Sequence, residues 1–261
     1  MDKADFKKSV QEFYGILKLE RRLVGVHLIN SLEEFSSIQA PIPKNPLNYC
    51  AMVKAATGGH AFKATTEHFA CKSGPRVLGI TPEDAQNSNG ETWTRLGLYA
   101  NSTVSSSVRH SLTYSQQKKY GVLVQPLEKY SELPDVIICV TIPYNIMRII
   151  QGYAYYYGMP KNIRMIGNQA VCLEATANPY ITQDMNVSML CIGTRHRTGW
   201  KDTEMAVGIP GQQWLSIVDG VIQTINPMES DTNKRQIKNN LSTLGIPSPL
   251  IKYKDNYYNK V

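Results

Sequence analysis

Apolar side chains recur at helical spacing near both ends of the chain. One stripe over residues 3–18 predicts an amphipathic N-terminal helix, because its members fall at i, i+4, i+7, i+8 and i+11. They are Phe6, Val10, Phe13, Tyr14 and Leu17. An apolar face also predicts a helix over residues 212–225, and a weaker helix is expected over 230–244. The N-terminal helix is expected to pack its apolar face against the body of the protein.

Short apolar runs between these helices predict the strands of a sheet. The runs are rich in β-branched residues and are bounded by turn formers, as buried strands are. They cover residues 23–29, 60–66, 121–127, 135–142 and 163–171, and another run ends at Cys191. Two helices lie between them, one over 50–57 and one from Asn145, as its N-cap, to Gly158. The pattern predicts an α/β fold with a mixed sheet.

The order strand, helix, glycine, strand, cysteine occurs twice along the chain. It leads to Cys71 in the first copy and to Cys172 in the second. One interpretation is an internal pseudo-twofold duplication of residues 20–127 and 134–226, which would place the two cysteines at equivalent strand ends. The alternative is that helices ended by glycine are common enough to mimic a repeat.

The length of the chain fits one large domain. With 261 residues, of which 42% are hydrophobic, residues 1–261 can bury a single core, and a C-terminal helix and tail occupy 228–261. Residues 81–112 are rich in Ser, Asn and Gly. This long excursion could form a lid or a surface for a partner.

The composition also limits where in the cell the protein is expected and which partners it is expected to bind. No run approaches the ~18 apolar residues of a membrane span, and residues 1–5 lack the apolar core of a signal peptide. We therefore expect a cytoplasmic protein without a membrane segment. The net charge of +7 is dispersed, which permits a small anionic ligand and gives no indication of nucleic-acid binding. The basic residues of 234–260 are better explained as a solvated helix face and tail, and a homo-oligomer is left open.

Cysteine is the most informative residue type. The five thiols stand singly in a chain without a secretion signal, so they should be reduced. Cys139 lies inside an apolar run and is expected in the core. Cys50, Cys71, Cys172 and Cys191 lie at element boundaries, where four thiolates would complete a zinc site or hold an iron–sulfur cluster. Because no C-x-x-C pair occurs, ordinary half-buried cysteines without a cofactor are the alternative.

Charged residues accompany these cysteines. Arg195 and Arg197 follow Cys191 and could bind a carboxylate or phosphate group, or form a simple basic turn. Glu67 lies near Cys71 and Glu174 near Cys172, where each could act as acid or base, orient a ligand, or be a surface carboxylate.

Several common enzyme classes have no support in the sequence. No G-x-S-x-G, Walker loop or strand-following G-x-G-x-x-G occurs, which removes the usual signals of serine hydrolases, P-loop proteins and dinucleotide-binding proteins.

Several segments together resemble an uncharacterised prokaryotic family, domain of unknown function 169. They occur in order over nearly the whole chain: LERRLVGV, YCAMVKAATGG, EHFACKSGPRVLG, LPDVIICVTIPYNIMRIIQG, VCLEATANPY, NVSMLCIGTR and EMAVGIP. The resemblance implies a prokaryotic, often anaerobic, cytoplasmic setting. It also implies that the family pattern includes the four boundary cysteines, Gly193 and Arg195, and does not require Cys139.

Three hypotheses follow. In the first, the four boundary cysteines bind an iron–sulfur cluster or another soft metal, zinc included, and Arg195, Arg197 or Glu67 holds an adjacent ligand. In the second, the protein is a cofactor-free thiol enzyme with Cys191 or Cys71 as nucleophile, Arg195 as substrate anchor and Glu174 as a further catalytic group. In the third, it is a non-catalytic binding or accessory protein.

Overall fold

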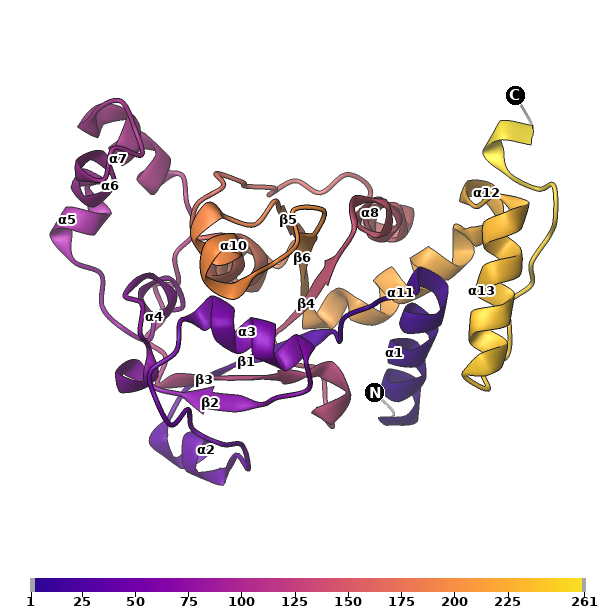
Figure 1. Ribbon diagram of the computed structural model, residues 1–261, viewed down its shortest axis with the longest axis horizontal. Coiled ribbons are helices and arrows are strands. Elements are labelled where there is room, and N and C mark those ends of the chain that lie inside the picture. The colour runs from indigo at the N-terminus through magenta and orange to yellow at the C-terminus, as the bar shows by residue number, and fades with distance from the viewer. Residues whose placement is uncertain (1–2, 260–261) are drawn as a thin grey trace.

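Six strands form one antiparallel sheet, in the order β2-β3-β1-β4-β6-β5 (Figure 1). The structure is a computed structural model that describes residues 3–259. The strands are β1 Val24–Ile29, β2 Phe62–Ala64, β3 Gly121–Pro126, β4 Val136–Thr141, β5 Asn186–Ser188 and β6 Met205–Pro210. The predicted α/β class is confirmed.

The sheet is not mixed, because every strand pairing in the described part of the chain is antiparallel. The reason lies in how β1 is flanked. β3 and β4 follow each other in sequence and both pair antiparallel to β1, one on each side. They are therefore parallel to each other without being neighbours, and no parallel pair with a helical crossover is formed.

Helices of very different length surround the sheet. They are α1 Lys3–Leu17, α2 Leu32–Ser37, α3 Tyr49–Thr57, α4 Ser73–Val77, α5 Ala85–Ser88, α6 Glu91–Arg95, α7 Ser102–His110, α8 Pro143–Tyr157, α9 Asn178–Thr182, α10 Ile192–Thr198, α11 Trp214–Gln223, α12 Ile225–Met228 and α13 Asp231–Thr243. Short 3₁₀ turns cover Thr66–His68, Leu127–Lys129, Gly211–Gln213 and Tyr257–Asn259, and a π-helix covers Ala170–Ala177. The N-terminal helix and the two C-terminal helices predicted from periodicity are present.

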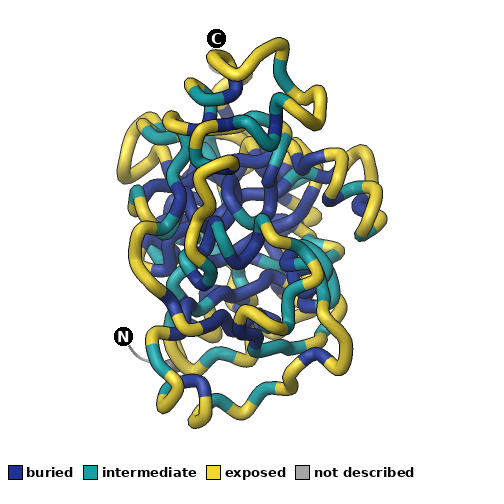
Figure 2. The backbone as a smooth tube through the Cα atoms, turned by 90° about the vertical axis from the view of Figure 1, so that its left-hand side faces the viewer, coloured by how far each residue is buried: buried dark blue, intermediate teal, exposed yellow. Residues whose placement is uncertain are grey.

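The two faces of the sheet carry different layers. On one face, Ile137 and Cys139 of β4 belong to a core cluster with α1, α8, α11 and α13, in which α1 packs on α11 and α13 packs on α1. Helix α3, helix α4 and the π-helix cover the other, where Ile138 and Val140 point. This alternation follows from the two-residue period of a strand. Figure 2 shows the buried backbone concentrated in the middle of the molecule, with exposed segments around it.

The start of α8 differs from the sequence prediction. Ile142 is the N-cap, and Pro143 occupies the first turn, where the missing N–H of proline costs nothing. Asn145 is buried inside the helix instead, and its side-chain amide donates to Leu17 O at 2.9 Å and to Thr141 Oγ1 at 2.8 Å. Asn145 therefore ties α8 to the end of α1.

The strand predicted over residues 163–171 is wrong. Residues 159–169 are irregular, and the chain then enters the π-helix. The Asn186 side chain takes the place of a strand partner, because its Oδ1 accepts from Arg164 N at 2.8 Å and its Nδ2 donates to Arg164 O at 3.0 Å. Without this strand the second copy of the suggested repeat is incomplete, so the structure does not show a duplication.

Two peripheral regions complete the molecule. Residues 81–112 contain α5, α6 and α7, which project at the end of the molecule opposite to α1 and α13 (Figure 1). At the other end, Lys234 of α13 is buried instead of solvated. Its Nζ donates to Lys252 O at 2.7 Å and to Asp255 O at 3.0 Å, so it fixes the C-terminal tail.

Candidate functional site

The four boundary cysteines line one cavity of about 530 Å³. Cys50 comes from α3, Cys71 from the loop before α4, Cys172 from the π-helix and Cys191 from the residue that precedes α10. The other lining residues are Asn48, Tyr49, Ala70, Lys72, Ser73, Gly74, Leu96, Asn168, Gln169, Ile192, Gly193, Thr194 and Arg197. The cavity lies on the α3 side of the sheet, whereas Cys139 is buried on the opposite side, as expected for a core residue.

Backbone hydrogen bonds place Cys71 beside Cys50. Leu47 and Phe69 form an isolated parallel bridge, in which Leu47 N donates to His68 O and Ala70 N donates to Leu47 O, both at 3.0 Å. Cys50 and Cys71 follow the two bridged segments by a few residues each. The bridge therefore fixes the separation of two chain segments that carry a thiol.

Gly74 allows this close approach. A Cβ atom at Gly74 would lie 2.8 Å from Tyr49 Cβ and 3.3 Å from Cys71 Sγ. Real Cβ atoms do not approach other atoms to 2.8 Å, so a larger residue would force α3 and α4 apart. The absence of a side chain at this position keeps Cys50 and Cys71 on the same wall of the cavity.

Cys172 is held by an eight-residue π-helix. Such helices are rare and are often found at functional sites. The buried Glu174 carboxylate stabilises this one by accepting Ile166 N at 2.7 Å and Gly167 N at 3.1 Å, and Asn186 Nδ2 donates to the Glu174 carbonyl at 2.7 Å. Gly208 of β6 lets the sheet contact the π-helix backbone, because a Cβ there would lie 2.2 Å from Ala175 O.

Cys191 is the N-cap of α10. Its Sγ accepts the backbone N–H of Thr194 at 3.3 Å and lies 2.9 Å from Thr194 Oγ1. The same threonine side chain also acts on Cys50, whose pKa it lowers. Thr194 thus lies near two of the four thiols and offers a hydroxyl to the sulfur of Cys191.

Burial and mutual proximity keep two of the thiols protonated at neutral pH. Burial, followed by the neighbouring Cys71 and Cys191, raises the pKa of Cys50 to about 11. Burial raises the pKa of Cys172 well above its ordinary value, and Cys71, Cys191 and Cys50 add to that shift. A bound cation would reverse this tendency, because metal coordination deprotonates thiols.

The thiols are not arranged around a single point. Among residues 3–259, no group of three or more His, Cys, Asp or Glu side chains has an arrangement that could hold a metal ion. The sulfurs therefore share a cavity without forming the close ligand set of one ion.

Arg195 and Arg197 lie in different environments, because residues two positions apart on an α-helix point about 200° apart. Arg197 lines the cavity, where its Nη1 lies 3.4 Å from Asn48 Oδ1. Arg195 does not line it. Its guanidinium donates to the carbonyls of Met189, at 2.7 Å, Glu204, at 2.8 Å, and Lys201. Arg195 therefore stabilises the turn after α10 and has no group directed at the thiols.

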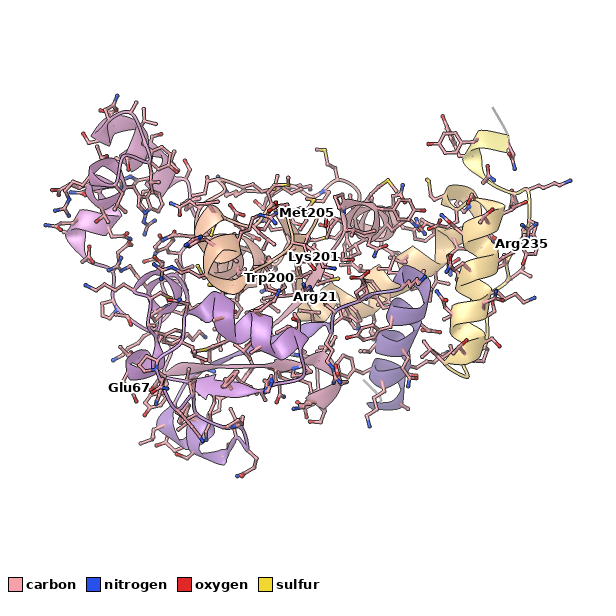
Figure 3. All side chains as sticks on the ribbon, in the orientation of Figure 1. Arg21, Glu67, Trp200, Lys201, Met205 and Arg235 are labelled. Carbon is pink, nitrogen blue, oxygen red and sulfur yellow. The ribbon has the colours of Figure 1, made fainter. Side chains whose placement is uncertain are left out.

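The two glutamates predicted beside the cysteines also lie outside the cavity lining. Glu174 is buried in the hydrogen bonds described above, and this burial raises its pKa. Glu67 is exposed and lines a different cavity with Lys118 and Lys119, and a hydrogen bond from Thr65 lowers its pKa. Figure 3 shows Glu67 well apart from Trp200, which follows α10 in sequence.

Sequence patterns did not single out Thr194, Lys72 or Gln169 as part of the site. Thr194 could have been found, because Cys191 and Thr194 have the N-cap to N3 spacing at the start of a helix. Lys72 directly follows Cys71 and Gln169 lies three residues before Cys172, so closeness in sequence to a cysteine was the signal available for both. In the same described range, no helix combines the length and the apolar character needed to cross a membrane.

The fold is one antiparallel sheet between two helical layers, and four cysteines from distant segments surround one cavity. These two features define the class as a single-sheet α/β protein with a thiol-lined cavity. The chain belongs to the family of domain of unknown function 169, described as "Uncharacterised ArCR", whose model matches residues 12–220. This confirms the resemblance found in the sequence, and the matched range contains all four cysteines.

One relative matches most of the chain but has no described function. An uncharacterised protein of Methanocaldococcus jannaschii is 23% identical over 225 residues, which cover 85% of this chain and 95% of the relative. No solved structure matches the chain.

Proposed function

We propose that the protein binds an iron–sulfur cluster, or another soft metal centre, through Cys50, Cys71, Cys172 and Cys191. The observation that supports the proposal is that these four thiols line one cavity although they come from four separate elements, while the fifth cysteine lies on the other side of the sheet. Thiolates are the preferred ligands of iron–sulfur clusters and of soft metals.

A four-iron cluster does not require the close ligand set that a single ion needs. The ligand sulfurs of a four-iron cluster surround a cube and lie farther apart than the four sulfurs around one zinc ion. The cysteines share a cavity without converging on one point.

Metal analysis of the anaerobically purified chain tests the proposal. We expect about four iron and four sulfide per chain, as in a Cys₄-ligated four-iron cluster. Cys172→Ala should abolish incorporation, and Cys139→Ala, the matched control on the other side of the sheet, should retain it. A colourless protein without iron, sulfide or zinc would refute the proposal, and so would equal metal content in the two variants.

A cofactor-free thiol enzyme is the second candidate. The observation that favours it is the pair of hydrogen bonds that Thr194 offers to Cys191, because such donors stabilise a thiolate nucleophile. Rapid alkylation of Cys191 alone, in a metal-free protein and with loss of function, would favour this candidate. Alkylation of all four cavity cysteines only after removal of a metal would favour the cluster.

A further inference from the structure

Two cations of the cysteine cavity have no anionic partner. Lys72 immediately precedes α4 and Arg197 lies on α10, and both side chains are exposed. Within residues 3–259 neither side chain forms an ion pair; the Lys72 side chain has no hydrogen bond in this range, and the Arg197 side chain has the 3.4 Å contact with Asn48. None of the described residues that line the cavity is an Asp or Glu. The cavity therefore presents uncompensated positive charge.

Two basic residues that line another cavity are paired with carboxylates. A smaller cavity near β4 is also lined by basic residues, but there Arg21 pairs with Glu204 and Lys201 pairs with Glu20 at 3.2 Å. The contrast is one of local composition, since the second cavity contains carboxylates and the cysteine cavity does not.

The remaining lining residues suit a small organic molecule. Leu96 and Ile192 expose 67% and 79% of their surface and provide apolar contacts. Asn168, Gln169 and Ser73 provide neutral hydrogen-bonding groups on the same walls. The cavity volume of about 530 Å³ is within the usual range of small-molecule sites and leaves room beside the sulfurs.

We infer that this cavity binds a small organic carboxylate, with its charged group between Lys72 and Arg197, its hydrocarbon part against Leu96 and Ile192, and its other end beside the thiols. The inference deepens the proposed function, because it takes the cysteine cavity as the functional site. It assigns the anion-binding role to Lys72 and Arg197, and not to Arg195, whose guanidinium is bound to backbone carbonyls.

A pair of alkylating reagents of similar size tests the inference on the full-length, metal-free chain. Iodoacetate carries the carboxylate that the site should bind, and iodoacetamide is its neutral counterpart. Each transfers its carbon to a thiolate and releases iodide. We expect the ratio of iodoacetate to iodoacetamide rates at the cavity cysteines to exceed that of the urea-unfolded chain by roughly tenfold, because two charge-assisted contacts hold the anion.

Variants separate binding of the anion from general access to the thiols. Lys72→Met and Arg197→Met should each lower the iodoacetate rate several-fold and leave the iodoacetamide rate within about twofold. Lys238→Met, on α13 at the far end of the molecule, is the matched control and should change neither rate. Acetate should protect against iodoacetate more strongly than inorganic phosphate does.

Three outcomes would overturn the inference. They are a native ratio equal to that of the unfolded chain, an equal fall of both rates in the two cavity variants, and stronger protection by phosphate. None of them bears on metal content, which is measured on untreated protein, so failure of the carboxylate site and failure of the metal site are distinguishable.

Discussion

Cys191 and Thr194 are in polar contact in the wall of the cavity, with Sγ and Oγ1 2.9 Å apart and the backbone N–H of Thr194 directed at the same sulfur. The thiol thus serves both as a helix cap and as a wall of the site. Its orientation is fixed from the helix side, whereas Cys71 sits in a loop.

Thr194→Val should slow alkylation of Cys191 by iodoacetamide. The substitution retains the backbone donor and the approximate shape but removes the hydroxyl, and loss of one hydrogen bond to a thiolate corresponds to roughly a tenfold lower rate. Mass spectrometry of the modified chain gives the rate at each cysteine. Thr198→Val is the control on the same helix, because its hydroxyl binds the Thr194 carbonyl and no sulfur. Equal rates in the two variants would contradict the role of the hydroxyl.

Arg148→Met should strongly destabilise the fold. The side chains of Arg148 and Glu229 are 0% and 3% exposed, and Nε lies 2.6 Å from Oε1. Removing the arginine leaves a buried carboxylate without its partner, which costs about 3–5 kcal/mol. Urea unfolding measures the loss. The double variant Arg148→Met with Glu229→Gln should recover part of it, and a double variant no more stable than Arg148→Met would contradict this explanation.

Stability should fall between about pH 6.5 and 9 because of His27. Its Nδ1 lies 2.9 Å from Asp135 and its Nε2 2.6 Å from Glu34, and the hydrogen bond to Asp135 is the main reason why its pKa is raised from 6.5 to about 9. The folded state therefore holds the proton more tightly than the unfolded state. The resulting stabilisation is complete below pH 6.5 and is lost as the pH rises through 9.

The size of this effect is limited by solvent, since 32% of the His27 side chain is exposed. We expect about 1–2 kcal/mol after screening. Urea unfolding at pH 6 and pH 9.5 should show this loss in the natural chain and not in His27→Gln. A stability difference between the two chains that does not change with pH would contradict the prediction.

Gly220→Ala should separate α11 from α8. A Cβ at Gly220 would lie 2.0 Å from Gly152 O, so the two helices touch through their backbones. Overpacking of this kind costs about 1–3 kcal/mol, or several degrees in the unfolding temperature. Ser216→Ala, at a half-buried position on the same helix, should change stability by no more than about 0.5 kcal/mol. An unchanged unfolding temperature in Gly220→Ala would show that the helices are not in backbone contact.

Periodicity predicted the elements whose burial follows a regular repeat. The stripe of Phe6, Phe13 and Leu17 gave α1, and the β-branched run through Cys139 gave β4, because each pattern reflects one buried face. The position of the four thiols at element boundaries likewise separated them from Cys139, which lies inside a strand and points to the other face of the sheet.

The π-helix could not be predicted in the same way. Residues 170–177 are apolar and fit a strand, a helix or a buried turn equally well, and the choice is made by groups far away in the sequence. Ser188 and Asn186 of β5 supply hydrogen bonds to Glu174, and Gly208 supplies the space for its neighbours. Arg195 illustrates a related limit, since adjacency in sequence to Cys191 does not determine which side of α10 a residue occupies.

The cysteine cavity takes Cys50 and Cys71 from the first half of the chain and Cys172 and Cys191 from the second half, with β3 and β4 between the two pairs in sequence. A growing polypeptide therefore cannot present all four sulfurs until most of it has been synthesised and the central strands have paired. Any ligand that contacts all four cysteines would therefore bind only the folded chain. By mass action it would then raise the melting temperature of the domain as a whole, in a single cooperative transition.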